Sequence, residues 1–431
     1  MMATKTIIQL KESKSDVENK SMKVTTITGG EYGFDWSELL EELVYSISQR
    51  FLLPDMIRFG CVCPSWKSVS APALRHKGRL PWLVVPYTAD RNVDESDNYC
   101  RDGLLGFFSI LDGITYKIET PELRERRILG ASFGWFTTVH GNSEMQLFQP
   151  LTKKIVRLPA ISKFPFVAGI RTDEEERLIY SVYIPDGTVF DIGSGGYMRD
   201  TLLHKAKTFF YPDRSSSHPS IVVVLPGIFG CCNLHFCRPG KDDCWNVIPK
   251  GDYGYHDFTF YKGNFYALRF NGTLDIMNGL DGLSPPTVSL VASLSVEEYE
   301  AYHYLLASSD DLWKVVRFLH DFIEDESYRP FTKTFNVFKL DFSKSKWVEA
   351  EDIGDHAFFV GSNNSFSVIA LDFPGCRENC IYFADDDGQY ISTGGHDNGI
   401  FNLKDGSIEA ICPVDAKYVC PRPMWYSPNI C

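Results

Sequence analysis

The sequence predicts an α+β multidomain chain in which three short helices precede one large all-β domain. Apolar residues recur at helical spacing between residues 36 and 70, whereas from residue 80 onward they alternate with polar ones, as in half-buried strands. The length of 431 residues allows two or three domains, and a hydrophobic fraction of 44% is ordinary for a globular protein. We therefore expect an arm at residues 1–34, a helical unit at 35–72, a β domain at 80–414 and a C-terminal tail at 415–431.

The charge balance and the short apolar runs argue against a nucleic-acid-binding protein and against a membrane protein. The chain has 43 Lys and Arg against 56 Asp and Glu, a net charge of −13, which is the wrong sign for a protein that binds nucleic acid by neutralising phosphates. No apolar run approaches the roughly 20 residues that span a bilayer, and residues 1–21 contain no signal-peptide core. We expect no nucleic-acid or membrane partner, reduced cysteines, and a location in the nucleus or cytoplasm.

The helical unit is expected to form three short amphipathic helices. Leu39, Leu43 and Ile47 recur every four residues and predict one apolar stripe on the first helix. Pro54 and Pro64 each interrupt a helical pattern and suit the first turn of the next helix. Three such helices make too small a core to be stable alone, so the unit needs a partner surface.

Hairpin signals mark the β domain. Lys262-Gly263-Asn264 and Asn271-Gly272 separate short strands, and a further strand at 287–294 completes a four-stranded meander. The next two stretches repeat this plan, since comparable second strands begin near Asn264, Asp311 and Ser365, in steps of 47 and 54 residues.

A repeat of one four-stranded sheet per step is typical of β-propeller blades. We expect about six blades, with a range of five to seven because the stretch from Phe164 to Ser220 is irregular. A large β-sandwich or two packed β domains is the alternative. The propeller is favoured because radial repetition protects the strand edges that a long all-β chain would otherwise expose.

The helical segment carries a family resemblance. Residues 36–70, WSELLEELVYSISQRFLLPDMIRFGCVCPSWKSVS, resemble an F-box in apolar spacing, in the Pro54-Asp55 break and in the closing Val62-Cys63 and Trp66. PWLVVP, LFQPLTKKIVRLP and YKGNFYALRFNGTLDIM resemble the plant-specific β-repeat domain that accompanies such F-boxes. Together they resemble a plant F-box protein of the domain-of-unknown-function-295 type, similar in architecture to the F-box/kelch group.

The resemblance implies a substrate-recognition subunit of an SCF-type ubiquitin ligase, without catalytic residues or cofactor of its own. The F-box would bind a Skp1-like adaptor, which links to cullin and RING subunits, and the β-propeller would hold a protein substrate. The residues that the resemblance places against the adaptor are Leu39, Leu43, Ile47, Leu52, Phe59, Val62 and Trp66. The alternative is an adaptor-independent β-propeller interaction scaffold with a degenerate F-box.

One position departs from the F-box pattern. The usual opening is Leu-Pro, whereas this chain has Leu39-Leu40. Ser37 is the expected N-cap of the first helix. Because proline pre-sets the backbone angle of a helix start, Leu40 is expected to weaken that start slightly while adding apolar surface.

A cysteine-rich segment is the best candidate for a metal site. Cys231, His235 and Cys237 would share one face of a strand, with Cys244 further on, and thiolate with imidazole suits zinc. The segment lacks a Cys-x-x-Cys pair, however, so we expect a core strand and no metal. No nucleophile motif is present, and a propeller hydrolase is the third and weakest hypothesis.

Acidic stretches at residues 173–176, 321–326 and 385–387 fall between the expected strands. Short acidic runs are ordinary solvated loops. The sharper hypothesis is a negative rim on the propeller that selects a basic target.

Overall fold

The structure, a computed structural model, describes residues 7–8, 24–25, 36–48, 50–51, 53–60, 62–77, 81–86, 103–110, 113–184, 186–193, 202–211, 218–227, 233–249, 254–293, 301–320, 323–324, 327–328, 331–361, 363–373, 375–385, 397–411 and 423–428. The chain divides into two compact units, Met1–Ala71 and Pro72–Cys431. Of the predicted arm at residues 1–34, only β1 (Ile7–Ile8) and β2 (Val24–Thr25) are described, and they pair antiparallel.

The helices follow one another closely in the chain: η1 (Trp36–Glu38), α1 (Glu41–Ser48), α2 (Leu53–Gly60) and α3 (Pro64–Lys77). The first α-helix starts later than the sequence predicts. Leu40, not Ser37, precedes its first residue, and the Leu40 carbonyl accepts hydrogen bonds from the amides of Leu43 and Val44, both at 3.0 Å. Glu41 and Glu42 occupy the first turn, where negative charge is favourable for the helix dipole. None of the helices among the described residues has the length and hydrophobicity of a membrane span.

The remaining chain is almost entirely β-structure. Five sheets have four strands: β32 (Met424–Tyr426), β3 (Trp82–Pro86), β4 (Leu104–Ser109) and β5 (Thr115–Glu119); β6 (Arg126–Ser132), β7 (Trp135–His140), β8 (Met145–Gln149) and β9 (Lys154–Leu158); β13 (Leu203–Phe209), β14 (Ile221–Pro226), β15 (His235–Cys237) and β16 (Asn246–Val247); β17 (Tyr255–Tyr261), β18 (Asn264–Arg269), β19 (Leu274–Asn278) and β20 (Thr287–Ala292); β21 (Ala301–Ala307), β22 (Leu312–His320), β25 (Phe331–Asp341) and β26 (Lys346–Ala350).

Three further sheets, which do not have four strands, complete the described β-structure. One has five strands, β28 (Phe366–Ile369), β27 (His356–Val360), β29 (Cys380–Phe383), β30 (Gly399–Asn402) and β31 (Ile408–Ala410); one has three, β10 (Val167–Thr172), β11 (Leu178–Tyr183) and β12 (Val189–Ile192); and one pairs β23 (Ile323–Glu324) with β24 (Ser327–Tyr328). Short 3-10 turns lie at η2 (Pro121–Leu123), η3 (Ile161–Lys163) and η4 (Ala370–Asp372).

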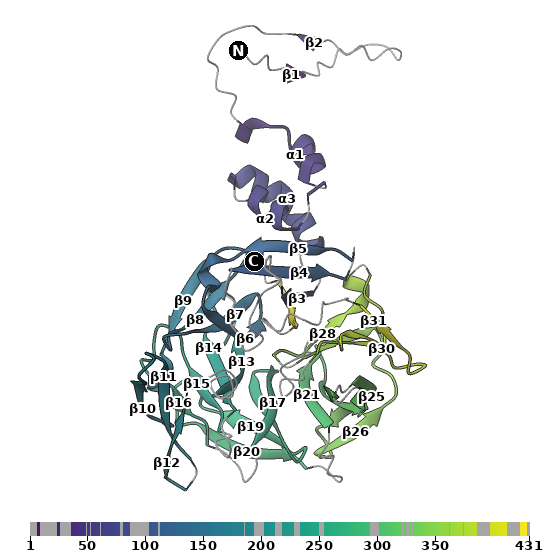
Figure 1. The fold of residues 1–431 in the computed structure, drawn as a ribbon. Coiled ribbons are helices and arrows are strands. Elements are labelled where there is room, and N and C mark those ends of the chain that lie inside the picture. Colours follow the sequence, from purple (N-terminus) through teal and green to yellow (C-terminus); the bar gives the residue numbers. More distant parts are fainter. Residues whose placement is uncertain are drawn as a thin grey trace. The chain divides into compact units, whose positions relative to one another are not determined.

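The large sheets surround a common centre, which makes this domain a β-propeller. Figure 1 shows β6, β13, β17 and β21 near the centre, with β9, β20 and β26 toward the periphery. The predicted meander is confirmed, since β17 to β20 pair in sequence order. Lys262 and Gly263 both have positive φ, 44° and 84°, so the β17–β18 hairpin closes with a type I′ turn.

Two parts of the propeller differ from the sequence-based expectation. In the last sheet, β27 pairs in parallel with β29, because β28 folds back antiparallel on the other side of β27 instead of following in order. The tail assigned to residues 415–431 contains a strand of the propeller, since β32 pairs antiparallel with β3. Alternation over only three residues is too short to be seen as a strand in the sequence.

Each large sheet packs apolar side chains against its neighbours. One cluster joins β6–β9, β13–β16 and the three-stranded sheet, and includes Leu147, Tyr180 and Val224. Others join β13–β16 to β17–β20, β17–β20 to β21–β26, and β21–β26 to the five-stranded sheet. A further cluster brings Trp425 of β32 against Phe359 of β27. The apolar core is therefore distributed between sheets around the ring.

The backbones of the inner strands β6 and β13 approach each other closely at Gly130. A Cβ atom added to Gly130 of β6 would lie 1.9 Å from the carbonyl oxygen of Ala206 in β13. The Thr208 hydroxyl donates to the Ser132 carbonyl at 3.2 Å and Arg127 donates to the Leu203 carbonyl at 2.9 Å. Only glycine leaves room for this approach.

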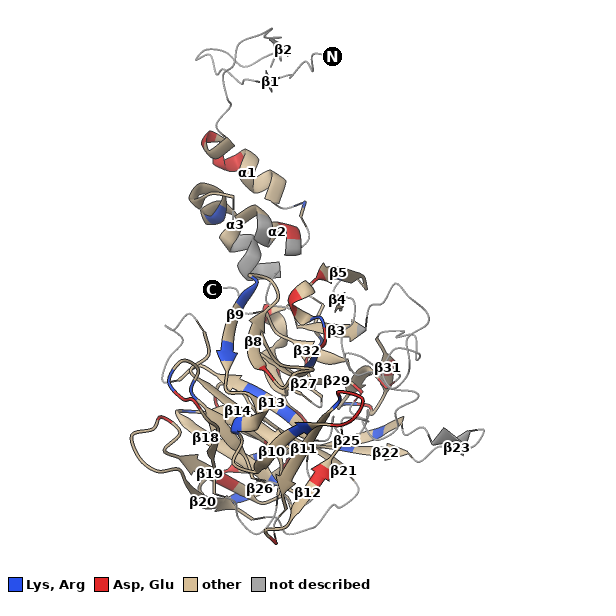
Figure 2. Ribbon diagram, turned by 60° about the vertical axis from the view of Figure 1, so that its left-hand side comes forward, with Lys and Arg blue, Asp and Glu red and all other residues tan. Residues whose placement is uncertain are grey.

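A buried carboxylate joins three sheets. Asp257 of β17 is fully buried and accepts from Lys207 of β13 at 2.6 Å, from Lys205 at 3.3 Å and from the amide of Leu305 in β21 at 3.0 Å. Burial raises the pKa of Asp257, but the two lysines and the amide outweigh burial, so the pKa lies below its ordinary value. Burial, opposed by Asp257, lowers the pKa of Lys207 to about 8. Figure 2 shows basic residues on β13 within the propeller.

We expect Gly130→Ala to lower the free energy of unfolding by about 3 kcal/mol, because the added methyl group forces two backbones apart. Gly169→Ala in β10 is the matched control, since a Cβ there meets no atom within 4 Å. Thermal unfolding of both variants checks this expectation, and equal midpoints would contradict it.

Replacing Trp425 with Ala is expected to cost about 3–5 kcal/mol of stability. The ring is 1% exposed, and its Nε1 donates to the Val360 carbonyl at 3.0 Å. Trp425→Phe keeps most of the packing and loses that hydrogen bond, so its cost should be distinctly smaller. Urea denaturation monitored by circular dichroism measures both losses. A larger loss of stability for Trp425→Phe than for Trp425→Ala would refute the packing account.

For Asp257→Asn we expect a loss of about 3–5 kcal/mol, because two buried lysines lose their counterion. Asp191→Asn breaks a 2.9 Å ion pair with Arg171 in which both side chains are about half exposed, and should leave the unfolding midpoint nearly unchanged. Denaturant titration of the two variants at neutral pH compares them directly, and similar losses would be inconsistent with the buried cluster.

Candidate protein-interaction surface

The helical unit has a small core of its own. Val44 of α1 and Met56 of α2 are fully buried, and Phe59 of α2 is 6% exposed. The Phe59 ring stacks on Trp66 of α3 with centroids 4.3 Å apart. The Trp66 Nε1 donates to the Trp36 carbonyl at 3.0 Å and so ties η1 to α3. These contacts fix the helices relative to one another within the unit.

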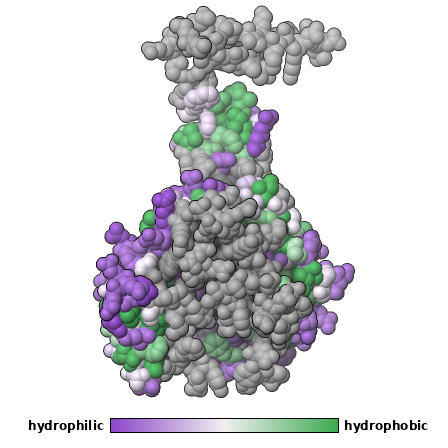
Figure 3. All heavy atoms as spheres, viewed as in Figure 1, coloured by the Kyte–Doolittle hydropathy of each residue, from purple (hydrophilic) through white to green (hydrophobic). Residues whose placement is uncertain are grey.

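A second face of α1, next to the buried one, is apolar and exposed. We define the apolar surface as the six large hydrophobic residues of the unit that are 39% to 62% exposed: Trp36, Leu40, Leu43, Tyr45, Ile47 and Val62. Leu40, Leu43 and Ile47 are spaced three and four residues apart and therefore lie on one helix face. Figure 3 shows hydrophobic side chains gathered on the helical unit. A patch of this kind on a small unit is typical of a protein-binding surface.

The seven residues that the resemblance placed against the adaptor differ in how exposed they are in the structure. Leu43, Ile47 and Val62 belong to the apolar surface, and Leu39 and Trp66 are half-buried. Phe59 lies in the core, where it supports the surface through Trp66 instead of presenting its own ring. Leu52 lies outside the described residues.

Three members of the apolar surface were not among the predicted contact residues. Leu40 was expected to weaken the helix start slightly and to add apolar surface, and 62% of its surface is exposed. Trp36 and Tyr45 are also exposed. Their signal in the sequence is weak, because neither follows the four-residue repeat. A large aromatic residue directly before a helix, as at Trp36, is the one feature that could have indicated it.

The cysteine-rich segment forms part of the propeller core. His235 and Cys237 are buried on β15, and the edge of the His235 ring contacts Phe164 and Phe166 at centroid distances of 5.4 and 5.2 Å. Burial lowers the pKa of His235 to about 4 and raises the pKa of Cys237. Cys231 lies outside the described residues. Among those that are described, no three His, Cys, Asp or Glu side chains are arranged to hold a metal ion.

The ring of sheets defines the class of this domain as a β-propeller, preceded in the chain by a helical unit with an exposed apolar surface. A family model described as KIB1-4 beta-propeller matches residues 107–402, from β4 to β30. The chain therefore belongs to the KIB1-4 beta-propeller family.

Relatives in Arabidopsis thaliana extend the likeness over nearly the whole chain. The F-box protein SKIP23 is 25% identical over 419 residues, covering 91% of this chain and 95% of SKIP23. A second protein named as an F-box protein, At3g25750, is 24% identical over 388 residues, 87% of this chain and 93% of that relative. These matches confirm the resemblance to a plant F-box protein with a C-terminal β-propeller. The narrower assignment to domain of unknown function 295 stays a prediction.

Among solved structures, the computationally designed protein Ika8 aligns with a TM-score of 0.32 at 10% identity, covering 78% of this chain and 88% of Ika8.

Proposed function

We propose that this chain is the substrate-recognition subunit of an SCF-type ubiquitin ligase. The helical unit binds a Skp1-like adaptor, through which cullin and RING subunits are recruited, and the propeller binds a protein substrate. The observation that carries the proposal is the apolar surface of the helical unit, in a chain whose relatives are named F-box proteins. Truncating a well-packed apolar anchor of an interface commonly costs more than about 1 kcal/mol of binding.

The proposed role needs no chemistry from this chain. A receptor that holds a substrate beside a conjugating enzyme accelerates transfer by raising the effective concentration of the target lysine. We therefore propose a non-catalytic receptor that acts in the nucleus or cytoplasm.

The domain boundaries follow from the same proposal. We assign residues 35–72 to the F-box and extend the propeller from 80 to Tyr426, because β32 completes its first sheet. We propose six blades, formed by the six sheets of four or five strands. The three-stranded sheet is then an insertion, since β6 and β13 meet directly at Gly130.

The alternative function is an adaptor-independent β-propeller scaffold with a degenerate F-box. Leu40 at the position of the usual proline is the feature that favours it. The structure reduces the weight of this feature, because Leu40 precedes α1 and its carbonyl accepts the first helical hydrogen bonds.

Co-purification of the full chain with a Skp1-type protein tests the proposal. Leu43→Ala combined with Ile47→Ala removes two exposed anchors without touching the core, and should weaken adaptor binding by about 30-fold or more. Leu283→Ala combined with Leu290→Ala is the matched control, because these leucines are at least as exposed but lie in the propeller.

The proposal fails if the wild-type chain does not bind the adaptor, which would favour the scaffold. It also fails if the α1 double variant binds as tightly as the control. Far-ultraviolet circular dichroism of both variants confirms that the helical unit stays folded.

A further inference from the structure

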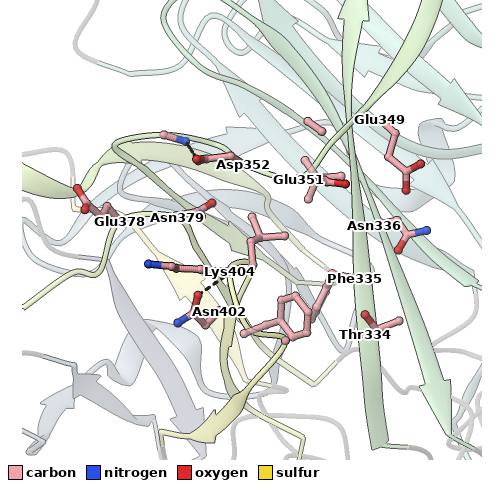
Figure 4. A pocket seen from close by; sticks show the side chains of 16 residues that line it. Thr334, Phe335, Asn336, Glu349, Glu351, Asp352, Glu378, Asn379, Asn402 and Lys404 are labelled. Carbon is pink, nitrogen blue, oxygen red and sulfur yellow. Dashed lines mark hydrogen bonds between the residues drawn. The ribbon is translucent and has the colours of Figure 1, made fainter.

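A groove of about 1270 Å³ opens between two neighbouring sheets of the propeller. One wall comes from β25, β26 and the segment that follows β26, and the other comes from the loop before β29 and the turn between β30 and β31. Figure 4 shows Asn336 and Glu349 on one side, with Glu378, Asn402 and Lys404 on the other. The groove is larger than the roughly 300–1,000 Å³ of a typical small-molecule site, and so has room for a run of residues.

The lining of the groove is acidic. Glu349, Glu351, Asp352 and Glu378 contribute four carboxylates, against one cation, Lys404, which leaves a formal charge of −3. Within the described part of the chain, the side-chain carboxylates of Glu349, Glu351 and Glu378 form no hydrogen bond or ion pair, although the Glu349 backbone pairs with Phe338 in the β25–β26 ladder. Nearby acids outside the groove are engaged, as in the 2.6 Å pair of Glu409 with Arg377.

Apolar and amide groups lie among these carboxylates. Phe335 and Phe401 are buried residues of β25 and β30 that form part of the lining. Asn336 and Asn402 add side-chain amides, which can hydrogen-bond a peptide backbone. A mostly polar groove of carboxylates and amides, with buried aromatic residues beneath it, suits an extended peptide that carries basic side chains.

A metal ion fits the groove less well than a peptide. Although four carboxylates line the groove, no three acidic, histidine or cysteine side chains among the described residues converge as a metal site requires. Carboxylates spread along a groove instead match cationic side chains spread along a chain, with which they form charge-assisted hydrogen bonds.

We propose that this groove binds an extended basic segment of a protein substrate, with Arg or Lys side chains against Glu349, Glu351 and Glu378, over a floor that the buried Phe335 and Phe401 support. The inference deepens the receptor role proposed above and rests on it for its biological meaning. It locates the selection for a basic target at residues other than the acidic stretches singled out from the sequence.

Fluorescence anisotropy with the full chain tests the proposal. The probe is a labelled nonapeptide of alternating Arg and Leu, compared with an alternating Glu and Leu peptide. We expect the Arg peptide to bind at least about tenfold more tightly, and Glu349→Gln, Glu351→Gln and Glu378→Gln together to weaken it by about tenfold or more.

A second triple variant controls for long-range charge. Glu174→Gln, Glu175→Gln and Glu176→Gln remove the same number of charges from an exposed turn between β10 and β11, and should change affinity by less than about twofold. Lys404→Gln removes the one cation of the groove and should tighten binding by about threefold, a gain that misfolding cannot produce.

Equal weakening by the two triple variants, or no preference of the wild-type chain for the Arg peptide, overturns the proposal. Adaptor co-purification is measured on the same proteins. If the Arg peptide does not bind at the groove while the adaptor still binds the chain, the receptor role stands without this site. If the adaptor fails while the Arg peptide still binds, the groove stands and the ligase role falls.

Discussion

Met424–Tyr426 pair with β3 in the register Val84↔Met424, Leu83↔Trp425 and Trp82↔Tyr426, and the first sheet of the propeller thereby gains its inner strand from the end of the chain. Adjacent residues of a strand point to opposite faces. Trp425 packs against the five-stranded sheet on one side, whereas Tyr426 lies against Phe136 of β7 on the other and donates to the Gly134 carbonyl at 3.1 Å. Two neighbouring side chains thus join the first sheet to both of its neighbours, and this contact closes the ring of sheets.

Buried charges add a second kind of contact between sheets. Besides Asp257, Arg317 of β22 is 1% exposed and donates to the Ala384 carbonyl at 2.8 Å and to the Asp397 carboxylate at 2.6 Å, next to β29 and β30. Apolar faces can slide against one another at little cost, whereas a buried ion must meet its partners or lose several kcal/mol. We interpret these ion pairs as fixing how far each sheet is turned against the next, with the apolar clusters supplying most of the stability.

The sequence was informative wherever the periodicity was local. The hairpins at Lys262-Gly263 and Asn271-Gly272, the four-stranded repeats and the helical stripe could be predicted, because each depends on residues close together in the chain. Contacts between residues that are distant in the sequence could not be predicted. The pairing of β32 with β3, the parallel pairing of β27 with β29 and the contact of Gly130 with Ala206 leave no periodic signal.

The candidate surfaces show the same limit. Leu43 and Ile47 are exposed on the predicted stripe, but the spacing that identified the F-box could not separate core from surface, and Phe59 belongs to the core. The acidic groove was missed because Glu349 and Glu378 lie 29 positions apart in the chain and meet only across two sheets. The WVEAED segment, which holds Glu349 and Glu351, was recognisable only as a strand.

The closing strand also constrains how the protein is made. During synthesis β3 leaves the ribosome among the first elements of the propeller, yet its inner partner β32 is almost the last to appear. Until then the first and last sheets each expose an apolar face. A prematurely terminated chain would therefore contain a propeller that is not closed, and such exposed faces are what chaperones and proteases recognise. Completeness of translation becomes a condition for a closed propeller.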